Sequence, residues 1–211
     1  MNSAAMLRAS VQSAPGIFSD ATLTVNGDAL FISIGIGSTL TVLDAVTYEK
    51  DFSVYVTDAN GVAAGNRSIT ISAFPPEYLK GSLVYGDKKW GYSSTSPTKC
   101  PNEDSNRNGI LNVGEDLNGN GLLDPGLPVV LFPAILTTDE NGYATFKMRF
   151  GKNYAWWLTT QVTARAQVGG TESSKTANYD LGMLLSDVES PSTPANKISP
   201  FGTATVCTSP S

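Results

Sequence analysis

The sequence contains no histidine. Histidine is the usual general base near neutral pH, a member of Ser-His-Asp and Cys-His nucleophile systems, and a common ligand of zinc and copper. Its absence excludes these chemistries but does not exclude carboxylate catalysis. The acidic pair Asp139-Glu140 falls in an expected turn, where solvated acids are the usual interpretation. We therefore expect a protein that is not an enzyme.

Positive charge and long apolar runs are also scarce. The net charge is −5, and the one close cationic pair, Lys88-Lys89, is best interpreted as a solvated turn. A nucleic-acid-binding protein would need a basic stripe, so no nucleic-acid partner is expected. No run approaches the roughly 18 apolar residues of a membrane span. Residues 1–15 lack the charged and apolar regions of a signal peptide, so we expect residues 1–18 to be a linker or residues added for expression.

Cysteine is limited to Cys100 and Cys207. Neither lies in an apolar run that would bury a free thiol, so we expect a disulfide, with two unrelated thiols as the alternative. The bond would close a loop of roughly 100 residues and contribute on the order of 4 kcal/mol in the chain-entropy model. It would tether the Pro/Ser-rich tail, residues 186–211, and would fit an oxidising extracellular environment.

Alternation of apolar and polar residues predicts β-strands along most of the chain. The clearest segments, with one apolar face each, are 51–57, 143–150 and 161–168. Further candidates are 20–26, 29–35, 39–43, 67–73, 128–132 and 174–181. Asn26-Gly27 predicts a two-residue hairpin turn between the strands on either side of it. Short strands with antiparallel connections indicate an all-β antiparallel sandwich over residues 19–185.

Three motifs, in this order, resemble the bacterial Ig-like domains of the invasin and intimin type. They are FSVYVTDANGVAAG at 52–65, TTDENGYATF at 137–146 and QVTAR at 161–165. The first motif lacks the family's proline and is one residue shorter, and the gap to the second is unusually long. The resemblance implies an extracellular immunoglobulin-like β-sandwich, used in tandem in bacterial surface adhesins. Its implied partners are neighbouring Ig-like domains or a surface or host ligand, although many such domains act only as spacers.

The long gap, residues 74–127, contains a twelve-residue pattern twice in tandem. A calcium loop needs oxygen donors at positions 1, 3, 5, 7, 9 and 12 and a glycine at 6. The donors of the first copy are Asp104, Asn106, Asn108, the Ile110 carbonyl, Asn112 and Glu115. Those of the second are Asp116, Asn118, Asn120, the Leu122 carbonyl and Asp124. Hard oxygen donors favour calcium as the cofactor, and a metal-free Asn/Gly-rich turn region is the alternative.

The two copies differ at position 12. The second copy has Leu127 there, without a side-chain oxygen, so Glu103, the repeat equivalent of Glu115, is a candidate donor from outside the loop. No amphipathic helices flank the loops, so we expect calcium to stabilise the insertion rather than to drive a sensor, with an affinity of roughly 10⁻⁴ to 10⁻³ M. Leu111 and Leu123, at position 8 of each copy, are expected to form a small shared apolar cluster.

Aromatic residues suggest an alternative function. Trp90, Tyr92 and Trp157 are candidates for stacking on sugars, and an exposed, roughly coplanar set would favour that function. Packing of the insertion on the sandwich is the other interpretation, and adjacent Trp156 and Trp157 should point to opposite faces of a strand. We expect a calcium-stabilised Ig-like module of a bacterial surface or secreted protein, structural or adhesive. The alternatives are a carbohydrate-binding module and, more remotely, an enzyme fragment.

Overall fold

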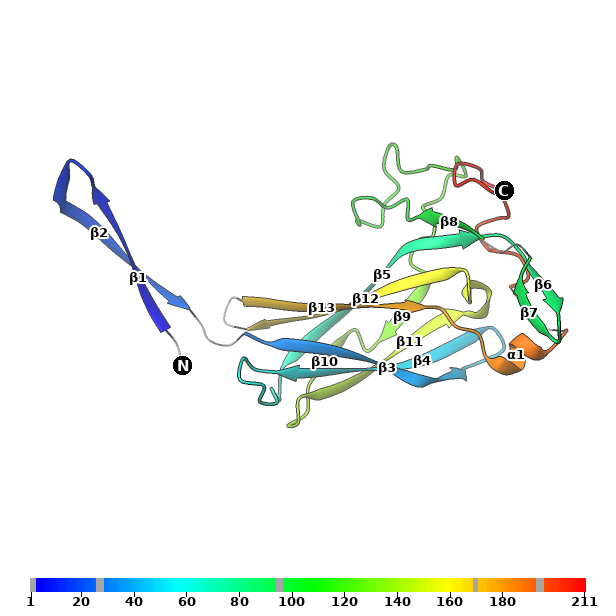
Figure 1. Cartoon of the computed structure of the whole chain (residues 1–211), viewed down its shortest axis with the longest axis horizontal. Coiled ribbons are helices and arrows are strands. Elements are labelled where there is room, and N and C mark those ends of the chain that lie inside the picture. The colour runs from blue at the N-terminus through cyan, green and yellow to red at the C-terminus, as the bar shows by residue number, and fades with distance from the viewer. Residues whose placement is uncertain (1–2, 26–28, 94–96, 169–170, 193–195) are drawn as a thin grey trace.

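The computed structural model describes residues 3–25, 29–93, 97–168, 171–192 and 196–211. The described chain is almost entirely β, and its sheets are antiparallel (Figure 1). Helical structure is limited to a 3-10 turn at Lys152–Tyr154 and the short α1 at Leu185–Glu189 in these residues. None of the helices in the described part of the chain is long and apolar enough to cross a membrane.

Two sheets face each other as a sandwich. Sheet one has the order β3-β4-β11-β9, with β3 at Phe31–Val42, β4 at Thr47–Thr57, β11 at Tyr143–Gly151 and β9 at Val129–Phe132. Sheet two has the order β10-β5-β12-β13, with β10 at Ile135–Thr137, β5 at Ser68–Lys80, β12 at Leu158–Val168 and β13 at Thr171–Asp180. A short strand, β8 at Thr98–Pro101, pairs with the C-terminal half of β5.

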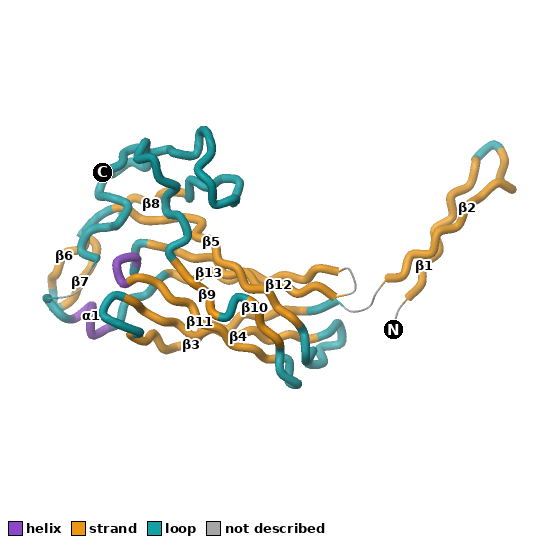
Figure 2. Tube along the Cα trace, turned by 180° about the vertical axis from the view of Figure 1, so that it is seen from behind, coloured by secondary structure: helices purple, strands orange, loops and turns teal. Residues whose placement is uncertain are grey.

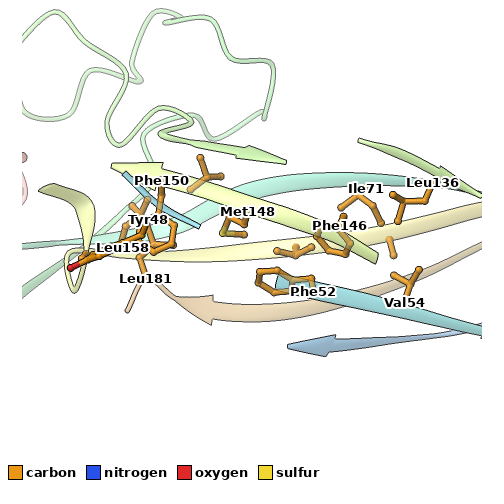
Figure 3. Close-up of a cluster of buried hydrophobic side chains, with 14 of the residues drawn as sticks. Tyr48, Phe52, Val54, Ile71, Leu136, Phe146, Met148, Phe150, Leu158 and Leu181 are labelled. Carbon is orange, nitrogen blue, oxygen red and sulfur yellow. The ribbon is translucent and has the colours of Figure 1, made fainter. Parts of the chain in front are cut away.

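The core lies between the two sheets and is built from the alternating side chains of their inner faces (Figure 3). Phe52 of β4 and Phe146 of β11 are cross-strand neighbours and stack with their ring centroids 5.1 Å apart. Val162 and Ala164 of β12 are buried on the sheet-two side. The period-two patterns at 143–150 and 161–168 therefore mark the inner faces correctly.

Strand β5 extends beyond the expected strand at 67–73. Residues 74–80 continue it and pair with β12 and β8, so part of the expected insertion belongs to sheet two. The prolines Pro75 and Pro76 lie where the register between β5 and β12 shifts, opposite Thr160. A bulge tolerates proline because ladder hydrogen bonds are already interrupted there.

The C-terminal tail is fastened to the end of sheet two. Cys100 of β8 and Cys207 form a disulfide with Cα atoms 5.5 Å apart, which confirms the expected pairing. Asn196 is buried and its carbonyl accepts a 3.0 Å hydrogen bond from the Trp157 indole. A small hairpin, β6 at Leu83–Gly86 and β7 at Lys89–Tyr92, lies beside the tail through the bridge between Ser82 and Ile198.

The N-terminal region differs from the sequence prediction. Residues 1–18 were expected to be a linker, but β1 at Ser3–Val11 pairs with β2 at Ala14–Val25 as a separate hairpin (Figure 1). The expected hairpin between 20–26 and 29–35 does not form, because β2 pairs with β1 and β3 pairs with β4. Its predicted turn, Asn26-Gly27, lies outside the described residues.

Candidate metal centre

The twelve-residue repeats form the loop between β8 and β9. In Figure 1 this loop lies at the end of sheet two, close to the C-terminus. Its first residues are tied to β5, because Asn102 donates from its backbone to Pro76 O (3.0 Å) and from its side chain to Pro75 O (2.6 Å). The loop therefore starts from a fixed point on the sandwich.

Asp104 organises the first loop. Its two carboxylate oxygens accept hydrogen bonds from the backbone N–H groups of Asn108 (3.0 Å) and Gly109 (2.9 Å). Asn106 accepts from Asn108 N (3.0 Å), and Asn108 accepts from Ile110 N (2.8 Å), so each asparagine forms a local turn. Gly109 has φ +71°, which explains the glycine required at position 6.

Glu115, at position 12, closes the first loop. One of its carboxylate oxygens accepts a hydrogen bond from the Ser105 hydroxyl (2.9 Å), and the other accepts one from Asn112 N (2.9 Å). Because Ser105 is near the start of the loop and Asn112 is at position 9, this one carboxylate spans the loop.

The Asn112 side chain lies where the prospective ligands converge. Its amide oxygen is 2.7 Å from Asn106 Nδ2 and 2.9 Å from Asn108 Nδ2. With the amide turned by 180°, the same position lies 3.1 Å from Ile110 O and 3.2 Å from Glu115 Oε2. Groups from positions 3, 5, 7, 9 and 12 therefore meet around one point.

The second loop repeats this arrangement. Asp116 accepts from Asn120 N (3.0 Å) and Gly121 N (3.0 Å). Asn118 accepts from Asn120 N (2.9 Å), and Asn120 accepts from Leu122 N (2.7 Å). Gly121 has φ +77°, close to its counterpart in the first loop.

Glu103 closes the second loop in the way that Glu115 closes the first. Its oxygens accept from Asn118 N (3.2 Å) and from Asp124 N, at position 9 (2.9 Å). Leu127, at position 12 by sequence, is exposed instead. The sequence pointed to Glu103 because it occupies the same place in the first copy of the repeat as Glu115 does in the second.

The environment of Glu103 is unusual for a carboxylate. Its side chain is 2% exposed, and no Lys or Arg forms an ion pair with it among the described residues. Burial raises the pKa of Glu103, the N–H groups of Asp124 and Asn118 lower it, and the charges of Asp124 and Asp116 raise it further. In contrast, the Asn112 N–H lowers the pKa of Glu115. A cation near Glu103 would relieve both the burial cost and the repulsion.

The donor set consists of oxygens from carboxylates, amides and backbone carbonyls, which suits calcium. Within the ranges that the structure describes, no group of three or more His, Cys, Asp or Glu side chains is arranged to hold a metal ion. Ligation would therefore depend on amide and carbonyl oxygens beside the carboxylates. Such donors are ordinary in calcium loops, where backbone and asparagine oxygens complete the shell.

The predicted apolar cluster at position 8 is not formed. Leu111 is 38% exposed, whereas Leu123 lines a small cavity with Phe74 and Leu127 on the β5 side of the loop. The Arg107 guanidinium lies over the Phe74 ring at 4.3 Å and covers the edge of that cavity. Both loops line this cavity beside β5, but of the two position-8 leucines only Leu123 does so.

The candidate sugar-binding aromatics do not form an exposed platform. Trp157 is 0% and Trp90 7% exposed, and their indole N–H groups donate to Asn196 O and Ser190 O. Tyr92 packs on Trp157 with an interplanar angle of 68°, so the rings are not coplanar. Tyr92 and Trp156 instead line a cleft at the end of sheet two. Trp156 and Trp157 lie in a turn before β12 rather than in the expected strand, and both contact Tyr92, although Trp156 is half-buried and Trp157 fully buried.

No protein-family model, curated protein or solved structure matches this chain. Its function is therefore inferred from its own loops and sheets.

Proposed function

We propose that this protein is a calcium-stabilised Ig-like module of a bacterial surface or secreted protein, with a structural or adhesive role. The observation that carries the calcium assignment is the pairing of Glu103 with the second loop. The sequence pattern alone leaves that loop one carboxylate short, and the fold supplies one in the equivalent position. Two loops with six prospective donors each are the result.

The order of the strands supports the Ig-like assignment. The chain crosses between the sheets from β4 to β5, β8 to β9, β9 to β10, β10 to β11 and β11 to β12, and its two antiparallel layers resemble those of an immunoglobulin sandwich. The first motif overlaps the second half of β4 and the second overlaps the start of β11, which pairs with β4, whereas the third lies inside β12 of the other sheet. The motifs therefore fall on core strands rather than on scattered segments.

Calcium has a clear physical task in this fold. The loop between β8 and β9 contains few buried apolar side chains to offset the entropy lost on ordering it. The charges of Asp124 and Asp116 also add to the rise in the pKa of the buried Glu103. A bound cation would neutralise this charge and hold both loops in one conformation.

The disulfide supports an extracellular location. Bonds of this kind persist in oxidising compartments and are rare in the cytosol. The Cys100–Cys207 bond fastens the tail beside the calcium loops, which suits a module exposed to proteases and changing conditions. A structural or adhesive role needs this durability, and it needs no catalytic group.

Calorimetric calcium titration tests the proposal by counting sites. We expect two sites in the protein, one in Glu103→Gln and one in Glu115→Gln, because each glutamate closes a different loop. Glu140→Gln, in the exposed turn before β11, is the matched control and should keep both sites. Absence of binding in millimolar calcium would refute the calcium role. If Glu115→Gln lost one site and Glu103→Gln lost none, the pairing of Glu103 with the second loop would be refuted.

Thermal unfolding gives an independent measurement. At about 10 mM free calcium and a dissociation constant of about 1 mM, two sites together stabilise the native state by about 2.8 kcal/mol. For a chain of this size that raises the melting temperature by roughly 6–11 °C relative to EDTA. Magnesium should have a smaller effect, because it prefers fewer protein ligands and more water. Equal melting curves in calcium and EDTA would contradict the proposal.

A further inference from the structure

The β1–β2 hairpin stands apart from the sandwich in both views of the chain (Figures 1 and 2). Every hairpin side chain whose burial is described, at 6–13 and 16–22, is exposed. An isolated two-stranded hairpin is marginally stable in water, because it has no apolar layer to cover its faces. Nevertheless its two strands are as long as those of the core sheets.

The two faces of the hairpin differ in chemistry. On one face Arg8 lies opposite Asp20, forms a 2.7 Å ion pair with it, and covers the Phe18 ring at 4.0 Å. On the other face Leu7 lies opposite Ala21, and Ala9 lies opposite Ser19. This second face, the Leu7–Ala9 face, carries only apolar or small side chains, and Leu7 is 57% exposed. The Arg8 face also carries the exposed Met6 and Phe18, so the faces differ in the charged pair, which only the Arg8 face has. A charged outer face and an uncharged inner face are typical of a strand pair at the surface of a sandwich.

The same pattern occurs in the core. Residues 7–11 read LRASV, and residues 164–168 of β12 read ARAQV. In both pairs of strands the arginine is exposed and forms an ion pair across the strands, with Asp20 directly opposite Arg8 and with Glu172 diagonal to Arg165 (3.7 Å). In both pairs the next alanine lies opposite a serine, Ala9 opposite Ser19 and Ala166 opposite Ser173.

This correspondence identifies what should cover the Leu7–Ala9 face. The counterparts of Leu7 and Ala9 are Ala164 and Ala166, which are buried against the inner face of sheet one. By analogy, the Leu7–Ala9 face requires the inner face of a comparable sheet. We propose that the β1–β2 hairpin forms the last two strands of a second Ig-like sandwich, whose opposing sheet covers the Leu7–Ala9 face.

A second copy of this chain does not meet that requirement. The inner face of its sheet one is already covered by sheet two, with Phe146 and Met148 buried. Docking there would require the copy to expel its own β12 and β13. The occupant is therefore a sheet of a separate Ig-like unit that lacks its own last two strands. This inference rests on the Ig-like part of the proposed function and does not depend on calcium.

Hydrogen exchange tests the inference, with this chain compared to the longest natural polypeptide that contains it, both in EDTA. We expect the amides at 6–22 to exchange roughly 100-fold more slowly in the longer polypeptide, because a covered hairpin opens less often. Leu7→Asp, on the Leu7–Ala9 face, should abolish this protection. Ser10→Asp, on the Arg8 face, is the control and should retain it.

Three results would overturn the inference. One is a gene that encodes no further β-strand unit joined to the hairpin. Another is equal protection of the hairpin amides in the two polypeptides. The third is dimerisation of this chain that is lost in Leu7→Asp, which would assign the Leu7–Ala9 face to a second copy. Because the exchange is measured in EDTA, a failure of the calcium proposal leaves these outcomes unchanged.

Discussion

Removing the Cys100–Cys207 disulfide should strongly destabilise this protein. The bonded residues are 107 positions apart, and the bond confines the two twelve-residue loops, β9 to β13 and most of the tail in the unfolded chain. For a closed loop of that length the chain-entropy relation gives about 4.8 kcal/mol at 25 °C. Since single domains are stable by about 5–15 kcal/mol, this is a large share of the total. The native tail keeps non-covalent anchors, because Asn196 and Phe201 are buried.

Guanidinium unfolding in EDTA measures this contribution directly. The double variant Cys100→Ala/Cys207→Ala should lose about 4–5 kcal/mol relative to the oxidised protein. The wild-type protein reduced with dithiothreitol is the matched control, because it keeps both sulfur atoms in the packing around the buried Cys100. Agreement between the two would assign the loss to the bond itself. A loss below about 1 kcal/mol in both, with an unchanged denaturant slope, would refute the loop-entropy reasoning.

Two further predictions concern the sandwich. The buried Glu49 accepts hydrogen bonds from Lys147 and Arg149, and these bonds, that of Lys147 most, lower the pKa of Glu49 in the folded protein. The ionised Glu49 therefore stabilises the fold fully above the ordinary glutamate pKa of about 4.3. This stabilisation is lost as the pH falls through the lower folded-state pKa. Glu49→Gln should therefore be less stable than wild type in urea at pH 7 and should approach it at acidic pH; a gap independent of pH would contradict this. Gly142→Ala should destabilise by well over 1 kcal/mol in urea, because a Cβ at φ +76° would lie 2.5 Å from Val56 O. Gly61→Ala, at φ +79° with open space around it, should reduce the stability less than Gly142→Ala does. Equal losses of stability in the two variants would show that the contact with Val56 O has no effect.

The core strands could be predicted because their pattern is local. In β11 the side chains of Phe146, Met148 and Phe150 alternate with polar residues, and one face of the strand is buried. Period two therefore reports both the strand and its orientation. The pairing partner of a strand depends on distant residues instead. Asn26-Gly27 predicts a local hairpin, but the strands on its two sides pair with β1 and β4.

The limits of the insertion were harder to predict for a different reason. Pro75-Pro76 reads as the end of a strand, since proline cannot donate to a ladder. The structure places these residues at a bulge and continues β5 to Lys80. A bulge arises from the register of two strands, which is not visible in either strand alone.

The repeated geometry of the two loops could be predicted from their spacing. Asp104 and Asp116, predicted as metal ligands at position 1, each accept hydrogen bonds from the N–H groups four and five positions later, whereas their binding of a metal stays a prediction. The failure was at Leu111, where spacing predicted contact with Leu123. Ligand spacing does not reveal what lies beside each leucine: Leu123 lines a cavity with Phe74 of β5, whereas Leu111 is 38% exposed.

The stabilising features of the insertion meet at one residue, Tyr78 of β5. It is the register partner of Cys100, and its ring packs on Phe201 of the tail with centroids 4.7 Å apart. Burial, followed by the charges of Glu103 and Asp124, raises the pKa of Tyr78 to about 12, which places the second loop beside the same ring. The disulfide, the tail and the Glu103-closed loop therefore hold the same end of sheet two. A cation bound at Glu103 would stabilise the packing around Tyr78 as well as the loop, so calcium would act on the sandwich rather than only on an exposed appendage.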